Sequence, residues 1–326
     1  MTPTFTLEHR LPPDYFTEAL RSDALRGLTA RPKTLPPTWF YDARGSELFE
    51  QITALPEYYP TRTEHAILTA RAQEIAAAVH AHTLVELGSG SSQKTRLLLD
   101  AMLAAGPLRD YVPVDVSESA LRQAAQGLNL AYPDLAVHAL VADFHQHLGL
   151  TGTQGPRLLA FLGGTIGNLL PGPRAAFLAR VAAELAPGDA LLLGTDLVKD
   201  PATLVAAYDD SAGVTAEFNK NVLSVLNHGL DADFAPDDFR HVALWDPEHE
   251  WIEMRLRAGH ALSVKVRELD LVVSFEPGED LRTETSAKFR AQGVRSELEQ
   301  AGLTLQHWWT DPAEQYALSL AVPARR

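Results

Sequence analysis

The stretch that decides how the chain is organised is ThrLeuValGluLeuGlySerGlySerSerGlnLysThrArg, residues 83–96. It begins with a short apolar run of strand type, turns through Gly88 and Gly90, and continues into a run that is typical of a helix. A strand that turns through glycines into a helix presents backbone N–H groups and a positive helix end to a ligand. The glycines permit close approach, because they lack a Cβ atom. The stretch therefore predicts the first strand–loop–helix unit of a ligand-binding α/β sheet.

The spacing of the glycines narrows the class of ligand. Position 93 is Gln, so the third glycine of the dinucleotide-binding pattern Gly-x-Gly-x-x-Gly is missing. Glu-x-Gly-x-Gly fits instead the first loop of S-adenosylmethionine-dependent methyltransferases, although an ordinary turn in another α/β domain would also explain the loop alone. The next apolar run ends in Asp115, where an acid could accept both ribose hydroxyls of a nucleoside. The two strand ends together predict S-adenosyl-L-methionine as the cofactor.

Strands and helices alternate regularly after residue 83. Predicted strands cover 84–87, 111–116, 137–141, 157–163 and 190–196, and predicted helices cover 93–104, 117–129 and 173–186. This alternation predicts a parallel sheet, whose ligands bind at the carboxyl ends of the strands. Five residues fall at those ends, namely Gly88, Asp115, Asp143, Gly163 and Asp196.

The pattern changes after residue 200. Helical segments are followed by alternating strands, and the chain closes with a helix and two strands, which is typical of a methyltransferase sheet completed by an antiparallel edge hairpin. We therefore predict an α/β fold with a Rossmann-like class I methyltransferase domain, made of residues 63–196 and 289–326. A second, α+β domain for substrate binding would comprise 10–62 and 197–288, with the substrate between the two. In this second domain Ser46 is the expected N-cap of an amphipathic helix.

Composition and charge exclude several classes of protein. The chain has 326 residues, of which 46% are hydrophobic, enough for one large or two ordinary domains. Its formal net charge is −14 and no basic stripe is present, which argues against a nucleic-acid or anionic-membrane partner. No apolar run reaches the roughly 18 residues of a transmembrane helix, the N-terminus lacks a signal-peptide pattern, and cysteine is absent. We expect a cytoplasmic monomer that acts on a small molecule.

The 12 histidines raise the question of a metal site. The close pairs are HisAlaHis at 80–82 and HisGlnHis at 145–147, and neither has an obvious third ligand. Two isolated pairs are more often surface residues. The sequence therefore predicts no metal.

Four separated blocks resemble one enzyme family. The first is TyrAspAlaArgGlySerGluLeuPheGluGlnIleThrAlaLeuProGluTyrTyrProThrArgThrGlu (41–64), and the second is ValGluLeuGlySerGlySerSerGlnLysThrArg (85–96). The third is PheLeuGlyGlyThrIleGlyAsnLeu (161–169), and the fourth is ArgThrGluThrSerAlaLysPhe (282–289). In matching order over nearly the whole chain, they resemble the histidine Nα-methyltransferases of ergothioneine biosynthesis. The resemblance implies conversion of L-histidine to Nα,Nα,Nα-trimethyl-L-histidine (hercynine), the first step of that pathway; the broader family also includes fungal enzymes that methylate tryptophan derivatives.

The resemblance implies six cofactor-binding residues, namely Tyr41, Gly88, Lys94, Asp115, Asp143 and Phe144. Asp115 would accept the ribose hydroxyls. Asp143 and Phe144 would hold the adenine, the acid at the exocyclic amine and the ring against the adenine face. Gly88 would let the methionine part approach, and Lys94 would pair with its carboxylate. Without the resemblance, Lys94 would be interpreted as a solvated helix lysine.

The resemblance also implies seven amino-acid-binding residues, namely Tyr58, Gly163, Asn168, Tyr208, Met254, Glu284 and Ser286. Asn168 can bridge an α-carboxylate and an α-amine, because its amide both accepts and donates. Tyr58 and Tyr208 can donate to the carboxylate. Glu284 suits an imidazole N–H or an imidazolium, and Ser286 can serve the other ring nitrogen. Met254 would be a flexible apolar wall.

Several of these positions also have a structural explanation. Tyr208 lies on a predicted helix and could serve packing alone, and Met254 in an alternating strand is typical of a core residue. Glu284 and Ser286 are two apart, so on an extended segment they face one side. That spacing fits two ligands for one ring, and it also fits an exposed polar face. The same alternation predicts that Glu253 points away from Met254.

The implied reaction is in-line transfer of a methyl group from a sulfonium to a neutral α-amine, which requires alignment and no metal. The implied catalytic residues are Tyr41 and Asn168. Tyr41 would orient the amine or relay its proton through water, although a tyrosine is a poor base at neutral pH. Three alternatives stay open: a methyltransferase of the same fold for another aromatic amino acid such as a tryptophan derivative, a non-catalytic S-adenosylmethionine sensor, and a Rossmann dehydrogenase. Glu284 argues against the first, because an indole has one N–H.

Overall fold

The computed structural model describes residues 5–90, 92–148 and 155–324. The chain folds into two compact units, each made of segments that are far apart in the sequence. Unit 1 combines the N-terminal residues up to Pro12 with Arg62–Leu197 and the chain from Phe289 onward. Unit 2 combines Pro13–Thr61 with Val198–Lys288.

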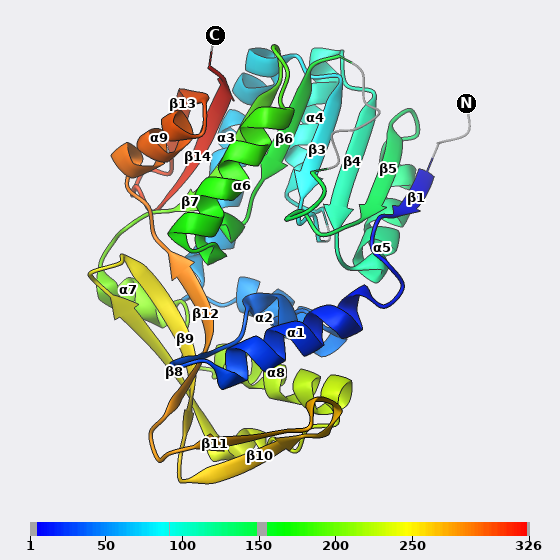
Figure 1. The fold of residues 1–326 in the computed structure, drawn as a ribbon. Helices are drawn as coiled ribbons and strands as arrows, with labels where there is room; N and C mark the ends of the chain where they lie inside the picture. The colour runs from blue at the N-terminus through cyan, green and yellow to red at the C-terminus, as the bar shows by residue number, and fades with distance from the viewer. Residues whose placement is uncertain (1–4, 91, 149–154, 325–326) are drawn as a thin grey trace. The chain divides into compact units, whose positions relative to one another are not determined.

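Unit 1 is built on an eight-stranded sheet with the order β1-β5-β4-β3-β6-β7-β14-β13 (Figure 1). Its strands are β1 (Phe5–His9), β3 (Thr83–Leu87), β4 (Asp110–Asp115), β5 (Ala136–Val141), β6 (Arg157–Phe161), β7 (Ala190–Asp196), β13 (Leu303–Thr310) and β14 (Tyr316–Pro323). The six strands from β1 to β7 in this order are parallel, whereas β14 runs antiparallel to β7 and β13 antiparallel to β14. This arrangement confirms the predicted class I sheet with an antiparallel edge hairpin.

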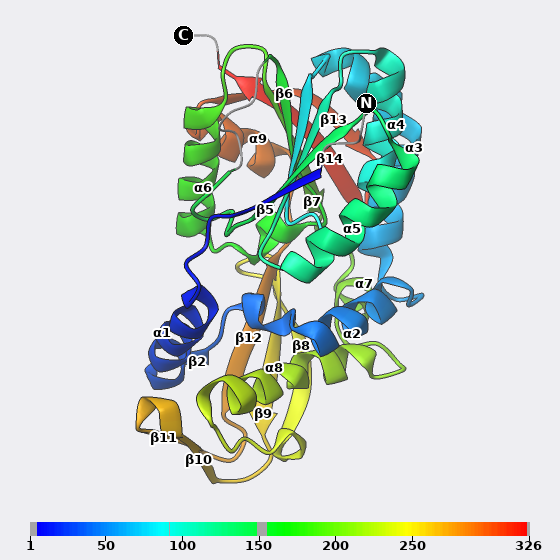
Figure 2. The same ribbon diagram turned by 90° about the vertical axis from the view of Figure 1, so that its right-hand side faces the viewer.

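Helices cover both faces of this sheet. They are α3 (Tyr59–Val79), α4 (Thr95–Ala105), α5 (Glu118–Ala131), α6 (Pro171–Glu184) and α9 (Ala291–Gln300). Figure 2 shows α3, α4 and α5 along one face and α6 with α9 along the other. Because both faces are covered, the central strands are continuous apolar runs, and every residue of β7 is buried.

The sequence did not predict β1, which pairs with β5 at the edge of the sheet. Its five residues, PheThrLeuGluHis, contain two apolar side chains, and none of the five is fully buried. An edge strand with polar residues lacks the apolar run by which the central strands were recognised. Its place in the sheet depends on backbone pairing with residues 137–141.

Unit 2 is an α+β unit. A four-stranded sheet has the order β2-β12-β9-β8, and β10 pairs with β11 in a separate hairpin. The strands are β2 (Lys33–Thr34), β8 (Phe239–Asp246), β9 (Trp251–Ala258), β10 (Leu262–Val266), β11 (Leu271–Phe275) and β12 (Asp280–Ala287). The α-helices are α1 (Tyr15–Thr29), α2 (Ala43–Thr53), α7 (Pro201–Ala206) and α8 (Val214–Leu230). The two-residue β2 and the strand β11 were not predicted.

The predicted N-cap of α2 is wrong. The helix begins at Ala43, so Ser46 lies within its first turn, and Asp42 is the N-cap. The Asp42 carboxylate accepts hydrogen bonds from Gly45 N and from Asn221 Nδ2, both at 2.7 Å. Aspartate caps helices as well as serine does, and the contact with Asn221 of α8 adds a tertiary interaction that the local sequence cannot reveal.

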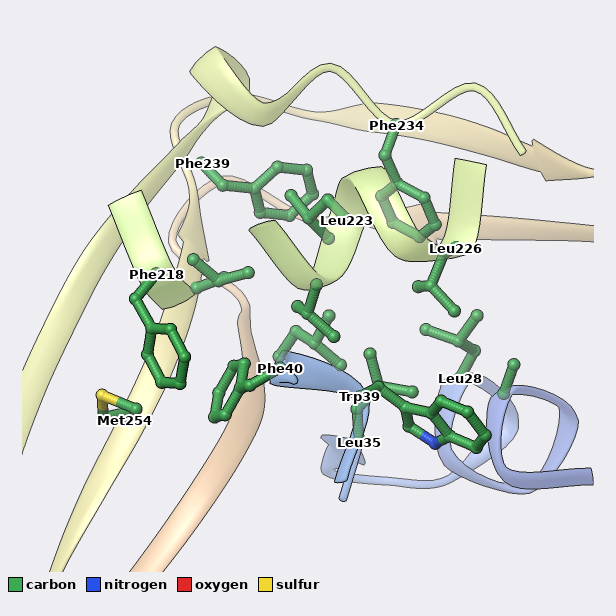
Figure 3. Packing of buried hydrophobic residues seen from close by; sticks show 14 of the residues in the cluster. Leu28, Leu35, Trp39, Phe40, Phe218, Leu223, Leu226, Phe234, Phe239 and Met254 are labelled. Carbon is green, nitrogen blue, oxygen red and sulfur yellow. The ribbon is translucent and has the colours of Figure 1, made fainter. Parts of the chain in front are cut away.

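The core of unit 2 lies between α8 and the inner face of the sheet. Phe218, Leu223 and Leu226 project from α8 into this core, where Figure 3 shows Met254 of β9 beside Phe218. Met254 is 1% exposed. Its side chain thus has the core role that strand alternation suggested, and a wall role toward a ligand stays a prediction.

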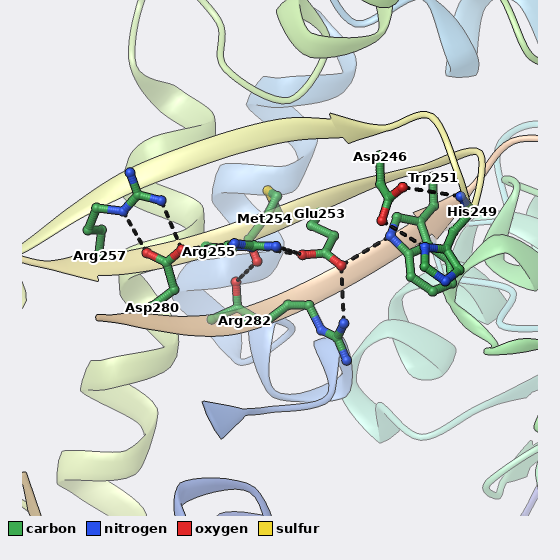
Figure 4. A network of polar contacts seen from close by, with 10 residues as sticks. Asp246, His249, Trp251, Glu253, Met254, Arg255, Arg257, Asp280 and Arg282 are labelled. Carbon is green, nitrogen blue, oxygen red and sulfur yellow. Dashed lines mark hydrogen bonds and ion pairs between the residues drawn. The ribbon is translucent and has the colours of Figure 1, made fainter. Parts of the chain in front are cut away.

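The outer face of the same sheet carries a charged network. Glu253 is buried and accepts from Arg255 Nε at 2.7 Å and from Arg282 at 3.1 Å (Figure 4). Asp280 in turn binds Arg255 and Arg257. Alternation places these side chains opposite the core, so the prediction that Glu253 points away from Met254 is confirmed. In the described ranges, no helix is long and apolar enough to cross a membrane.

Candidate active site

The glycine loop after β3 has the backbone geometry of a close-approach turn. Gly88 and Gly90 have φ of 65° and 50°, a region that favours glycine. A Cβ atom built at either position would have no heavy atom within 4 Å, so both glycines border open space. Gly88 N donates to Val114 O at 2.8 Å, which fixes the loop to the end of β4. Residue 91 of this loop lies outside the described residues.

Asp115 ends β4 and fixes both the glycine loop and the start of α5. Its carboxylate accepts from Gly90 N and from Ser117 N, both at 2.9 Å, and Ser117 is the N-cap of α5. Burial raises the pKa of Asp115, and the backbone donors at Ser117, Gly90 and Val116 oppose that increase. Each carboxylate oxygen has a second lone pair, so Asp115 retains acceptor capacity for a ligand.

Asp143 and Phe144 follow β5, the next strand in the sheet. Asp143 Oδ1 accepts from His145 N at 2.7 Å. The Phe144 ring packs against Phe161 at 5.2 Å between centroids. Arg180 of α6 donates to Phe144 O at 2.9 Å and also binds His145 O, so it holds this turn from the adjacent helix.

Lys94 forms an ion pair that the sequence did not predict. Its Nζ donates to the carboxylate of Glu64 on α3, a residue that is 0% exposed. The other Glu64 oxygen accepts from Gly163 N and from Tyr316 OH, both at 2.8 Å. A Cβ at Gly194 would clash with this oxygen, so the glycine in β7 leaves room for the carboxylate. Glu64 therefore joins α3 to the loop that follows β6, to the start of β14 and to the start of α4.

Gly163 and Asn168 both follow β6. Gly163 has φ of 76°, and a Cβ built there would lie 3.6 Å from Lys94 Nζ. The structure thus brings Gly163, predicted for the amino acid, close to Lys94, predicted for the cofactor. Asn168 ends the short 3₁₀ helix Thr165–Asn168 and is half-buried.

Glu86 is a fully buried acid beneath the glycine loop. It accepts from Thr95 Oγ1 at 2.6 Å and from the hydroxyl of Tyr111, which also contacts Ser92 Oγ at 2.9 Å. Burial raises the pKa of Glu86 to about 7, against the opposing effects of these two donors and of the Lys94 charge. The network therefore ties β3, β4 and the start of α4 together around one acid.

The pH dependence of unfolding tests this acid. Because the folded pKa lies above the usual value, Glu86 makes the free energy of unfolding fall as pH rises from about 4.5 to about 7. Each pKa unit corresponds to about 1.4 kcal/mol, so the expected effect is on the order of 3 kcal/mol. In Glu86→Gln this decrease should be absent, as measured by urea unfolding at pH 5.5, 6.5 and 7.5. Parallel curves for the parent and the variant would contradict the assignment.

In unit 2 two of the predicted residues, Tyr208 and Ser286, meet around a third that was missed. Tyr208 OH and Ser286 Oγ lie 2.8 Å apart, and the buried Lys288 donates to both, at 2.8 and 2.9 Å. Glu284 lies opposite Met254 in the β12–β9 register, and Ser286 lies opposite Ile252. Glu284 and Ser286 therefore share the inner face of β12, as their spacing predicted.

Aromatic rings extend this cluster. Tyr58 lies edge-on to Tyr208 with 6.5 Å between centroids, and Phe49 lies 6.1 Å from Tyr58. Tyr41 is 46% exposed, and its ring packs edge-on against Phe49 and Phe218. Tyr41 thus belongs to the aromatic group of unit 2, whereas the other five predicted cofactor residues lie in unit 1.

Two residues of these clusters, Glu64 and Lys288, were missed. Each lies inside a block that was used for the resemblance, but neither follows a recognisable spacing, and their partners are distant in the sequence. The described part of the chain contains no group of three or more potential metal ligands.

The site in unit 1 fits S-adenosylmethionine. Open space beside Gly88 and Gly90 and a half-buried carboxylate at the end of β4 match the groups that hold a nucleoside with an amino-acid tail. The sheet order and this site define the class of the protein as a class I S-adenosylmethionine-dependent methyltransferase.

Comparisons with known proteins narrow the class. The model of the family described as "Histidine-specific methyltransferase, SAM-dependent" matches residues 20–323, and the chain belongs to this family. The chain is 57% identical to the histidine N-alpha-methyltransferase of Mycolicibacterium smegmatis, over 98% of this chain and 99% of that protein. It is 56% identical to the protein of the same name from Mycobacterium tuberculosis, over 93% and 94%. Ergothioneine biosynthesis protein 1 of Neurospora crassa is 30% identical over 82% of this chain and 31% of that protein.

Proposed function

We propose that this enzyme transfers three methyl groups in succession from S-adenosylmethionine to the α-amine of L-histidine, giving hercynine, the first step of ergothioneine biosynthesis. The choice of histidine as the substrate rests on one observation: Glu284 and Ser286 lie on the same face of β12. Two polar groups on one face can serve the two nitrogens of an imidazole ring. The identity of 57% over nearly the full length of a histidine N-alpha-methyltransferase supports the same substrate.

The cofactor would be held by the strand ends of unit 1, and Tyr41 is a further proposed cofactor residue. Asp115 would accept the ribose hydroxyls, and Asp143 and Phe144 would bind the adenine. Lys94 would bind the methionine carboxylate while keeping its ion pair with Glu64, since an ammonium has three hydrogens to donate. Gly88 gives the methionine part access to the backbone.

The amino acid would be held mainly by polar side chains. Asn168 would bridge the α-carboxylate and the α-amine, Gly163 is a further proposed contact, and Tyr58 would donate to the carboxylate. The Tyr208 hydroxyl would instead lie at the ring end of the substrate, beside Ser286. The ring would lie between Glu284 and Ser286, with Met254 behind it. These contacts orient the amine nitrogen, and alignment of reacting atoms is a large source of rate acceleration in such transfers.

S-Adenosylmethionine, when bound, supplies an electrophilic methyl group: the amine lone pair forms the C–N bond, the C–S bond breaks, and its electron pair stays on sulfur. The amine must have lost its proton before each of the three transfers. Tyr41 would orient the amine and relay that proton to water, and its 46% exposure provides the contact with solvent. Tyr41 and the neighbouring rings would also favour the cationic product.

Replacing Asn168 with Ala should raise the KM for histidine at least tenfold, because the α-carboxylate and the α-amine would both lose a hydrogen-bond partner. The Kd for S-adenosylmethionine should stay within twofold. Asn227→Ala is the matched control, since Asn227 bonds Phe234 N and O at 2.8 Å and should affect stability alone. Steady-state kinetics and calorimetry measure both quantities. An unchanged KM in Asn168→Ala would contradict the assignment.

The main alternative is the N-methylation of another aromatic amino acid, such as a tryptophan derivative. Glu284 and Ser286 together favour imidazole, because an indole has one N–H and would leave one of them unpaired. A time course with S-adenosylmethionine and either histidine or tryptophan, followed by mass spectrometry, distinguishes the two. Mono-, di- and trimethylated histidine in succession supports the proposal, and turnover of tryptophan alone would reject it.

We also propose that the enzyme acts as a cytoplasmic monomer without nucleic-acid or membrane partners. The net charge of −14 opposes binding to polyanions. Light scattering coupled to size-exclusion chromatography tests the oligomeric state, and a mass of twice the 35.6 kDa of the chain would contradict it.

A further inference from the structure

We propose that Lys288 is a specificity-determining residue that selects a substrate ring with an unprotonated nitrogen. The inference rests on the proposed function, because it concerns the same amino-acid site. Lys288 follows β12 directly and is 4% exposed. Its ammonium lies 4.7 Å from the centroid of the Tyr208 ring.

Three polar atoms form a closed triangle at this point. Lys288 Nζ lies 2.8 Å from Tyr208 OH and 2.9 Å from Ser286 Oγ, and the two oxygens are 2.8 Å apart. An ammonium can donate but cannot accept. Both hydroxyl oxygens therefore accept from Lys288, and their own hydrogens must point away from it.

The triangle changes what the two hydroxyls can offer a ligand. One hydroxyl donates to the other, so the remaining hydrogen of the pair is directed out of the triangle. A serine hydroxyl alone can accept or donate, but beside Lys288 it is biased to donate. A ring on the inner face of β12 would then meet an acceptor in Glu284 and a donor at Ser286 and Tyr208.

A neutral imidazole matches this arrangement, because it has one N–H and one bare nitrogen. An imidazolium has two N–H groups and a positive charge, and it would face both a donor and the Lys288 ammonium. A ring with C–H in place of the bare nitrogen would leave the buried donor unpaired, which is costly. Lys288 would thus act through Ser286 and Tyr208 as a positioning residue.

Two analogues test this role at one pH. Pyrrol-2-ylalanine and pyrrol-3-ylalanine each keep one ring N–H and replace the other nitrogen by C–H. For the parent enzyme, kcat/KM should be at least about 100-fold higher for histidine than for the better analogue. In Lys288→Met, which keeps the length of the side chain without the charge, that preference should fall at least tenfold.

The matched control is Lys33→Met. Lys33 is also 4% exposed, lies 4.6 Å from the centroid of the Phe275 ring, and pairs with Glu279. Its replacement should lower the melting temperature and leave the preference for histidine unchanged. If Lys288→Met does not fold, Lys288→Gln replaces it in the same assay with the same expectation.

The outcomes separate this inference from the proposed function. If the parent methylates histidine but shows no preference over the analogues, or if the Lys288 variant keeps the full preference, the inference is overturned and the function stands. If the parent does not methylate histidine, the proposed function fails and the inference fails with it. If Lys288 had a structural role alone, its replacement would lower kcat/KM for all three substrates by the same factor.

Discussion

Replacing Asp115 with Ala is expected to weaken the binding of S-adenosylmethionine by about 100-fold or more. The carboxylate would hold the ribose, and it already fixes Gly90 N and Ser117 N at 2.9 Å. Hydrogen bonds to charged groups contribute about 1.5–3 kcal/mol each. The loss of the bonds to both ribose hydroxyls therefore corresponds to an increase in Kd of about 100-fold or more. Titration calorimetry with S-adenosylmethionine, or with S-adenosylhomocysteine, measures the change directly.

Two further variants show where the effect arises. Asp115→Asn keeps the shape and one acceptor oxygen, so its Kd should lie between those of the parent and the Ala variant. Asp110→Asn changes the other end of β4, where Asp110 pairs with His138, and should leave the Kd unchanged. Binding by Asp115→Ala as tight as in the parent would exclude Asp115 as the ribose acceptor.

Replacing Glu284 with Ala should raise the KM for histidine by about 30- to 100-fold. Glu284 is half-buried on the inner face of β12 opposite Met254, and its carboxylate would accept the ring N–H. A charge-assisted bond of about 2–3 kcal/mol accounts for a factor of this size. Steady-state kinetics at saturating S-adenosylmethionine measure the KM, while kcat should change less because the reacting amine lies at the other end of the substrate.

Thr285 provides the matched control for this variant. It lies between the two proposed ring ligands and opposite Glu253, so its side chain belongs to the outer face of the sheet. Thr285→Val should leave the KM for histidine within twofold. A KM that rises equally in both variants would indicate a general distortion of β12, and an unchanged KM in Glu284→Ala would reject the ring contact.

Local patterns in the sequence were sufficient to predict the central strands of unit 1 and its C-terminal hairpin. Gly88 and Asp115 could be placed at neighbouring strand ends because apolar runs of five or six residues between helical segments specify a parallel sheet. The polar edge strand β1 could not be predicted in this way, because its pairing partner β5 lies more than one hundred residues away in the sequence. Ser46 was misplaced because several residues near a helix start can cap it, and the contact of Asp42 with Asn221 decides between them.

The candidate site shows the same limit. The spacing of Glu284 and Ser286 correctly predicted a shared face, because alternation along a strand is a local property. Glu64 and Lys288 could not be found in this way. Each is a buried charge whose role depends on partners from other elements, such as Tyr316 for Glu64 and Tyr208 for Lys288. A buried charged residue is recognisable only once the fold has brought its partners together.

The most direct test of the account is a competition experiment analysed by mass spectrometry. Purified enzyme would be incubated with S-adenosylmethionine and all twenty amino acids together. The account predicts that histidine alone gains methyl groups, up to three of them. Methylation of tryptophan or of another amino acid in place of histidine would contradict the roles of Glu284 and Ser286, and no methylation of any amino acid would contradict the proposed reaction itself.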